Sequence, residues 1–193
     1  MLSQIYEKGV AMGKNIVLIG FMGTGKSTVG MRLAERLHLE FVDMDREIER
    51  ITGMSISQLF RKHGETRFRS EEQLMAQKLG QRTNLVIATG GGVVIHPENV
   101  AALKRNGIIV GLEASPEVIM SRVSRKKSNR PLLSKHTTIE DIEKMLASRE
   151  EYYARADIRV NTTGQELNKV VNEIISQVKR MNSRRKNSSE SRE

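Results

Sequence analysis

The chain has 193 residues, of which 38% are hydrophobic, and this suits one domain with a single core. It contains no cysteine, which excludes disulfide frameworks and thiolate metal sites and leads us to expect a reducing, cytoplasmic location. No apolar segment approaches the roughly 20 residues that span a bilayer, so we expect no membrane partner. The apolar residues 16–20 indicate a buried strand rather than a signal peptide, because a glycine-rich turn follows them directly.

The formal net charge of +9 is unevenly distributed. Residues 122–135 contain basic side chains and no acidic one, and residues 179–193 form a second basic stretch. Residues 181–193 lack apolar anchors, so we expect a disordered, solubilising tail and no specific nucleic-acid partner. Residues 1–13 show no periodicity and are interpreted as an N-terminal extension, which leaves residues 14–180 as the domain.

Strand-like and helix-like patterns alternate along this domain. Short apolar runs predict strands at residues 16–20, 41–43, 85–88, 108–112 and 158–160. Helical spacing and end signals predict helices after residue 27, up to Gly53, at 57–62 and 68–79, from Pro97 to Gly107, from Pro116, at 139–155 and at 167–178. This alternation predicts an α/β fold, in which helices cover both faces of a parallel sheet.

The basic stretch is also the least regular part of the domain. Residues 123–137 are long for a loop in a compact domain and carry no periodic pattern. Loops of this kind are often functional lids, so we expect a lid at about residues 122–137.

The most specific motif is GFMGTGKS at residues 20–27, which matches the phosphate-binding loop G-x-x-x-x-G-K-[ST]. An apolar strand precedes it and an amphipathic helix follows it, as that motif requires. Its backbone N–H groups and helix N-terminus can bind phosphates, its lysine reaches the outer phosphates, and its serine hydroxyl can ligate Mg²⁺. We therefore expect a nucleotide site with ATP and Mg²⁺ at Gly23, Thr24, Gly25, Lys26, Ser27 and Thr28.

Other users of a phosphate loop are less compatible with the rest of the chain. A guanine-nucleotide switch should contain N-K-x-D, but the nearest string, at residues 168–171, reads NKVV and lies on the apolar face of a predicted helix. No D-x-x-G follows the loop, and a motor or transport ATPase usually needs a longer chain. A small kinase remains.

Four further features suggest where the acceptor binds. Asp43 and Asp45 lie at the end of the second strand, where strand alternation places both carboxylates on one side and Met44 on the other. Carboxylates there can hold a metal's waters, accept a hydroxyl proton or bind a polyol, although one of them, Asp45 above all, could instead cap the next helix. Arg69 and Glu72 are three residues apart on one helix and can pair. Glu72 falls on the apolar stripe of that helix, where a carboxylate needs a cation, but an ordinary surface pair is an equal alternative.

The third feature is the Gly90–Gly92 triplet after a buried strand, where backbone can approach a ligand closely or serve as a hinge. The fourth is Arg149, which stands where the stripe of the predicted helix 139–155 calls for an apolar residue. It either extends along the surface to solvent or points into a cleft to meet a carboxylate. Two arginines and two acids indicate a small acceptor that carries hydroxyl groups and a carboxylate, and only 4% aromatic residues argues against a nucleotide acceptor.

Taken in order, these motifs resemble those of the shikimate kinase family over residues 14–178 or so: GFMGTGKST, DMD, FRSEE, GGG, RPLL and R-x-x-Y. The resemblance implies a three-layer α/β/α P-loop kinase fold with a five-stranded parallel sheet in the order 2-3-1-4-5. It also implies ATP-dependent phosphorylation of the 3-hydroxyl of shikimate, on the route to chorismate and aromatic amino acids, and we expect a monomer.

Carried over by position, the resemblance gives each motif a role. Lys26, Asp43 and Arg130 become the catalytic residues, with Asp43 and Ser27 near the metal and Arg130 closing from the lid. Arg122 resembles the arginine that stacks on adenine, and the loop at 162–164 lies on the adenine side. The acceptor residues become Asp45, Arg69, Gly91, Gly92 and Arg149, with Glu72 orienting Arg69.

Two rival functions stay open at this stage. Another small-molecule kinase of the same fold, such as a gluconate kinase, would share the phosphate loop but not the acceptor. A nucleotide-gated protein that binds nucleic acid would explain the positive charge.

Overall fold

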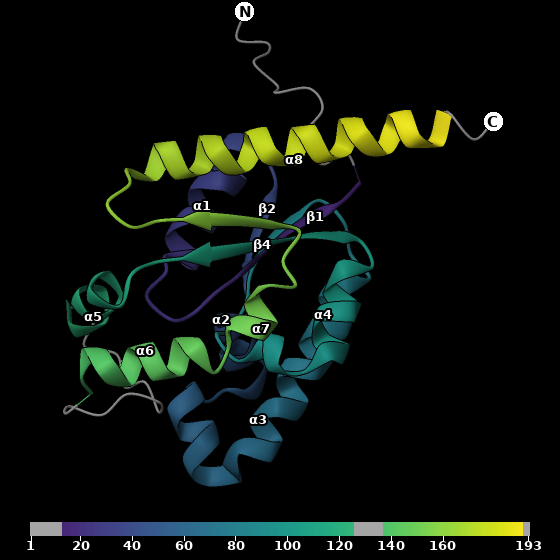
Figure 1. The fold of residues 1–193 in the computed structure, drawn as a ribbon. Coiled ribbons are helices and arrows are strands. Elements are labelled where there is room, and N and C mark those ends of the chain that lie inside the picture. Colours follow the sequence, from purple (N-terminus) through teal and green to yellow (C-terminus); the bar gives the residue numbers. More distant parts are fainter. Residues whose placement is uncertain (1–12, 126–136, 191–193) are drawn as a thin grey trace, which may run out of the picture.

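The computed structural model describes residues 13–125 and 137–190, and a five-stranded parallel sheet in the order β2-β3-β1-β4-β5 forms its centre (Figure 1). This order and the α/β class confirm the predicted fold. Each strand lies within one residue of its predicted position: β1 (Asn15–Ile19), β2 (Glu40–Asp43), β3 (Leu85–Ala88), β4 (Gly107–Glu113) and β5 (Ile158–Asn161).

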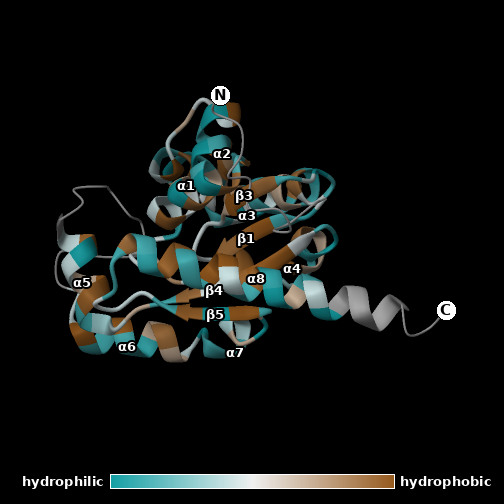
Figure 2. Cartoon of the chain, turned by 90° about the horizontal axis from the view of Figure 1, so that it is seen from above, coloured by the Kyte–Doolittle hydropathy of each residue, from teal (hydrophilic) through white to brown (hydrophobic). Residues whose placement is uncertain are grey.

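Helices cover both faces of the sheet and complete three layers. One face carries α1 (Lys26–Leu37) and α8 (Leu167–Glu190), and α8 runs alongside β4 and β5 in the opposite direction (Figures 1 and 2). The other face packs against α2 (Met44–Thr52), α3 (Ile56–Gly80), η1 (Val93–Ile95), α4 (Pro97–Lys104), α5 (Pro116–Arg125), α6 (Ile139–Ala147) and α7 (Glu150–Tyr153).

The central strand shows why the sheet needs both layers. Side chains of β1 alternate between two apolar clusters: Ile16 and Leu18 pack toward α1 and α8, whereas Val17 and Ile19 pack toward α3 and α4. All four are 2% exposed or less. A strand that is buried on both faces reads as a continuous apolar run, which is the pattern that made it predictable.

Parallel pairing brings the ends of neighbouring strands together. Leu18 of β1 and Asp43 of β2 both pair in register with Ala88 of β3. The turns that follow these three strands therefore begin side by side at the carboxyl edge of the sheet, where open α/β sheets bind ligands.

The predicted helix at residues 139–155 is wrong as one element. The helix stops at Ala147 and α7 starts at Glu150, because Arg149 has φ −117° and ψ −1°. Packing outweighs helix continuity here: Tyr153 is buried, and its hydroxyl donates to the carbonyl of Gly91 at 3.2 Å.

Two other elements are longer than predicted. The helices expected on either side of Gly64 form one run, α3, which changes direction at that glycine (φ 77°, ψ 177°). Helix α8 continues to Glu190, although disorder was expected from residue 181. Extending a helix that is already nucleated costs little, and this can carry a polar sequence onward. Within residues 13–125 and 137–190, no helix is both long and apolar enough to cross a membrane.

Candidate active site

The phosphate loop connects β1 to α1 as predicted. Gly23 and Gly25 have φ values of 82° and 100°, which only glycine adopts readily, and they turn the backbone around the N-terminus of α1. Lys26 is 9% exposed, and its ammonium group donates to the carbonyls of Gly20 (2.7 Å) and Phe21 (3.0 Å). This folded loop presents a cation and a helix N-terminus on one side, which is the arrangement that binds phosphates.

The other residues of the loop lie where the motif requires. Thr24 is buried, and its hydroxyl donates to the Phe21 carbonyl at 2.8 Å, whereas Thr28 is exposed in the first turn of α1. Ser27 donates its hydroxyl to Oδ2 of Asp43 at 2.7 Å. The structure therefore brings together the two residues that we predicted to contact a metal.

These two side chains fit a magnesium ion. Both offer hard oxygen atoms, and Mg²⁺ commonly binds one or two protein groups while it keeps waters and substrate phosphates. No group of three or more His, Cys, Asp or Glu side chains able to hold a metal occurs among the described residues. The donor set thus suits an ion that arrives with the nucleotide rather than one caged by protein.

Asp43 and Asp45 do not lie on one continuous strand, because β2 ends at Asp43 and α2 begins at Met44. The strand stops at Asp43, which accepts from the Arg46 backbone N–H at 3.4 Å and caps α2, so the predicted strand alternation over Asp43 and Asp45 is wrong. Met44 nevertheless points away from solvent, as that alternation predicted. Met44 between them is fully buried, and Asp45 lies in the first turn of α2.

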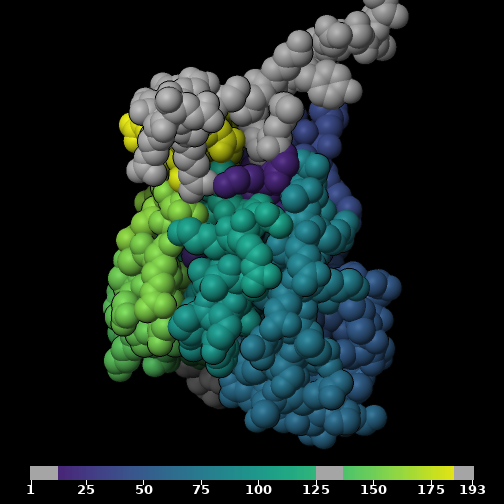
Figure 3. All heavy atoms as spheres, turned by 90° about the vertical axis from the view of Figure 1, so that its right-hand side faces the viewer, coloured from purple at the N-terminus to yellow at the C-terminus, as the bar shows by residue number. Residues whose placement is uncertain are grey.

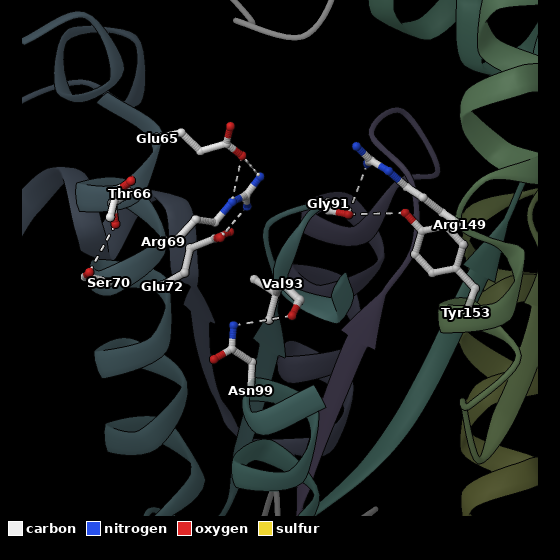
Figure 4. A network of polar contacts seen from close by, with 10 residues as sticks. All are labelled: Glu65, Thr66, Arg69, Ser70, Glu72, Gly91, Val93, Asn99, Arg149 and Tyr153. Carbon is white, nitrogen blue, oxygen red and sulfur yellow. Dashed lines mark hydrogen bonds and ion pairs between the residues drawn. The ribbon is translucent and has the colours of Figure 1, made fainter. Parts of the chain in front are cut away.

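Arg69 is the centre of the network in Figure 4. Its Nη1 donates to Oε2 of Glu72 at 2.5 Å, which confirms the predicted pair. Its Nε and Nη2 both donate to Oε1 of Glu65, at 3.1 and 2.9 Å. The sequence analysis did not identify Glu65, although the spacing of four residues on one helix is a signal for such a pair.

Glu72 is a buried carboxylate, as its place on the apolar stripe predicted. Its side chain is 1% exposed, and Oε1 has no hydrogen-bond partner in the described part of the chain. Burial raises the pKa of Glu72 to about 7, an effect that Arg69 opposes and that Asp45 and Glu65 reinforce. The carboxyl group of Glu72 therefore gains or loses its proton near neutral pH.

Glycine is required by close packing in the turn after β3. A Cβ atom on Gly90 would lie 2.7 Å from Oδ1 of Asp45 and 2.9 Å from Oε1 of Glu72, and one on Gly92 would lie 2.5 Å from Nη1 of Arg69. The turn thus packs directly on the predicted acceptor residues. Gly90 was not among the predicted site residues, and it is as tightly enclosed as Gly92.

Arg149 reaches the same turn from the opposite side. Its Nη1 donates to the Gly91 carbonyl at 3.4 Å, and its guanidinium lies 5.4 Å from the centre of the Phe21 ring in the phosphate loop. Figure 4 shows Arg69 on α3 and Arg149 beside α7 flanking Gly91. In the space-filling view, the green segment of α6 and α7 and the blue segment of α3 likewise lie on either side of the teal segment that contains α4 (Figure 3).

Arg122 lies on the nucleotide side of the phosphate loop. Its Nη1 donates to the Gly23 carbonyl and to the Thr162 hydroxyl, both at 3.1 Å, and its Nη2 donates to the Thr162 carbonyl at 3.1 Å. These bonds tie α5 to the loop and to the turn after β5. Stacking on adenine stays a prediction, and Arg130 and most of the expected lid lie outside the described residues.

The fold and site together define a nucleotide-binding phosphate-loop protein of the kinase type. A family model described as shikimate kinase matches residues 22–179. A shikimate kinase of Pelotomaculum thermopropionicum is 52% identical over 169 residues, which cover 88% of this chain and 98% of that protein. One of Desulforudis audaxviator is 49% identical over 166 residues, which cover 86% and 87%. The chain therefore belongs to the shikimate kinase family.

Solved structures agree with this assignment. Shikimate kinase from Acinetobacter baumannii, solved in complex with shikimate, matches with a TM-score of 0.82 and 38% identity over 87% of this chain and 94% of that one. A gluconokinase from Sinorhizobium meliloti has a TM-score of 0.58 but only 16% identity, so it shares the fold alone.

Proposed function

We propose that this chain transfers the γ-phosphoryl group of ATP to the 3-hydroxyl of shikimate and releases ADP and shikimate 3-phosphate. The observation that carries this proposal is the position of Arg149. Its guanidinium lies against both the phosphate loop, at Phe21, and the glycine turn, at Gly91. A carboxylate held there would place the rest of a small acceptor beside the donor phosphates.

The donor half of the reaction is assigned to the phosphate loop. Transfer of a phosphoryl group needs alignment and neutralisation of negative charge rather than covalent participation by the protein. Lys26 and the N-terminus of α1 supply positive charge to the phosphates, and Arg130 in the lid is proposed to add a second cation. Arg122 is proposed to contact adenine from its position against Gly23.

Mg²⁺ is proposed to bind with ATP at Ser27 and Asp43. When bound, the ion would neutralise charge on the phosphate oxygens. Asp43 is also proposed to hold the acceptor hydroxyl in line with the phosphate. Because its Oδ2 accepts from Ser27 and its backbone position is fixed at the cap of α2, its orientation is set before ligands arrive.

The acceptor half is assigned to residues around the glycine turn. Arg69 and Arg149 are proposed to bind the carboxylate of shikimate, with Gly91 and Gly92 lining its ring and Asp45 contacting its ring hydroxyls. Arginine suits this role because its planar donors match a carboxylate in a bidentate pair. Glu72 is proposed to orient Arg69, whose Nη1 lies 2.5 Å from Oε2 of Glu72.

A coupled assay of ADP release tests the proposal. The purified chain is given ATP and Mg²⁺ with shikimate, gluconate or a nucleoside monophosphate in parallel reactions. We expect turnover that depends on shikimate and is saturable, with at most background rates on the other two. Turnover on gluconate but not on shikimate would refute the assignment of the acceptor.

We also propose that the enzyme works as a cytoplasmic monomer. All proposed site residues come from one chain, and the described site needs no group from a second copy. Light scattering after size exclusion should give a mass near 21.8 kDa. A mass near twice that value at assay concentrations would contradict the monomer.

A further inference from the structure

The donors of Arg69 are divided between two very different carboxylates. Nη1 binds Glu72, whose side chain is 1% exposed, whereas Nε and Nη2 bind Glu65, whose side chain is 64% exposed. A buried ion held by one cation is costly to separate, whereas an exposed pair contributes little and opens easily. Glu72 is thus the permanent partner of Arg69, and Glu65 is the exchangeable one.

Glu65 occupies the side of the guanidinium best suited to another carboxylate. Nε and Nη2 lie on the same edge of the planar group, and this edge commonly forms the two parallel bonds of a bidentate pair. The carboxylate of Glu65 accepts both bonds with one oxygen, Oε1. An incoming carboxylate with two free oxygens could form both bonds with better geometry.

The local charge also argues that one carboxylate must leave before another binds. Asp45 and Glu72 lie against the same glycine, Gly90, and both Asp45 and Glu65 disfavour the charged form of Glu72. The guanidinium of Arg69 therefore already binds two carboxylates, those of Glu65 and Glu72, and Asp45 adds negative charge beside Glu72. A third carboxylate on Arg69, with Glu65 still in place, would add repulsion among these acidic groups, so exchange is favoured over addition.

We propose that Glu65 is an internal competitor for the acceptor's carboxylate: it covers the Nε–Nη2 edge of Arg69 and is displaced when the acceptor binds. The proposal rests on the proposed function, in which Arg69 binds that carboxylate. Gly64, just before Glu65, interrupts the helical conformation of α3 and leaves this side chain at the start of a new helical segment. The consequence is selectivity for acceptors that carry a carboxylate, because a neutral polyol cannot replace the charged contacts between Glu65 and Arg69.

The test compares two charge-neutralising variants on the same helix. Glu65→Gln removes the competitor, and Glu71→Gln is the matched control, because Glu71 pairs with Arg67 at 2.5 Å and also spans four residues. We expect Glu65→Gln to lower KM for shikimate by up to about fivefold, the contribution that an exposed ion pair makes to an equilibrium constant. KM for ATP and kcat should not change, and Glu71→Gln should leave all three constants unchanged.

A second acceptor separates competition from a general effect on the site. In an analogue of shikimate whose carboxylate is reduced to a hydroxymethyl group, the gain in Glu65→Gln should disappear. In Glu65→Gln, the amide oxygen of the new side chain can still accept a weak hydrogen bond from Arg69. Glu65→Ala removes this bond as well, and it should lower KM for shikimate in the same way. Thermal unfolding of each variant confirms that it is folded.

The outcomes distinguish this inference from the proposed function. An unchanged or raised KM for shikimate in both Glu65 variants, with normal turnover by the wild type, would overturn the inference alone and make Glu65 a support for Arg69. A lowered KM for the neutral analogue as well would also overturn it. Absence of turnover of shikimate by the wild type would overturn the proposed function and the inference with it.

Discussion

At the scale of single residues, Glu72 is a side chain whose surroundings oppose its negative charge. It is buried beside Gly90, it has one cationic partner, and Asp45 and Glu65 add negative charge nearby. Burial raises its pKa from the ordinary value of 4.5 to about 7. The folded protein therefore holds this proton more tightly than the unfolded chain does.

This shift predicts a pH dependence of stability. The contribution of the Glu72 proton is fully present below about pH 4.5 and is lost as the pH rises to about 7. The free energy of unfolding of the wild type should fall relative to that of Glu72→Gln across this window, by about 1.4 kcal/mol per pH unit at most. Urea unfolding of both proteins between pH 4.5 and 8 measures it, and parallel curves would contradict the shift.

Lys26 carries the clearest prediction for catalysis. Its ammonium is held by two loop carbonyls, so it is positioned before the phosphates bind. Replacing Lys26 by Met keeps the apolar stem and removes the charge, and we expect kcat to fall by on the order of 100-fold or more, as when a positioned donor to a charged transition state is lost. A near-normal kcat in a variant that unfolds at the wild-type temperature would refute the loop assignment.

The contacts of Arg69 and Gly90 could be predicted only in part from the sequence. The spacing on α3 predicted that Arg69 and Glu72 can pair, which is confirmed, but it left a buried pair and a surface pair as equal alternatives, and the structure shows Glu72 buried. Glu65 was missed because spacing shows which side chains can meet on a helix but not which donors are left after the first pair forms. Contact of Gly90 with two carboxylates comes from packing between α2, α3 and β3, which no local pattern contains.

At the scale of elements, the break between α6 and α7 places Arg149. A continuous helix was expected because Ile142 and Tyr153 keep apolar spacing, and both are buried in the same cluster. Arg149 at the break has φ −117° and ψ −1°, which depart from regular helix values, and it donates to the Gly91 carbonyl. Strands were easier to predict, because a short apolar run such as that of β3 depends on burial alone.

This position predicts a selective kinetic effect. Arg149→Ala should raise KM for shikimate by tenfold or more and KM for ATP much less, since a charge-assisted bond to the carboxylate contributes roughly 1.5–3 kcal/mol. Arg155→Ala is the matched control, because Arg155 is exposed and pairs with Glu151 at 3.0 Å. Equal increases of both KM values in Arg149→Ala would indicate a structural role instead.

At the scale of the whole molecule, α8 separates the core from the positively charged C-terminal end. Val170, Val171, Ile174, Ile175 and Val178 pack on the sheet, and among the side chains that the structure describes, Met181 is the last that packs against this cluster. The described contacts of the site come from elements before α8. We therefore expect that the positive C-terminal end is not required for the proposed chemistry.

Truncation tests this separation. A chain that ends after Asn182 keeps Met181 and should retain wild-type kcat and both KM values. Steady-state assays with and without added nucleic acid make the comparison. Loss of ATP turnover in a folded truncated chain, or turnover that requires nucleic acid in the wild type, would favour the rival reading of the net charge.

The direct test of the central claim is identification of the product. The wild-type chain is incubated with ATP, Mg²⁺ and shikimate, and the products are followed by ³¹P NMR. We predict one new phosphomonoester signal on the 3-hydroxyl of shikimate, formed in equal amount with ADP and absent when shikimate is replaced by gluconate. Release of ADP and inorganic phosphate with shikimate recovered unchanged would contradict the claim.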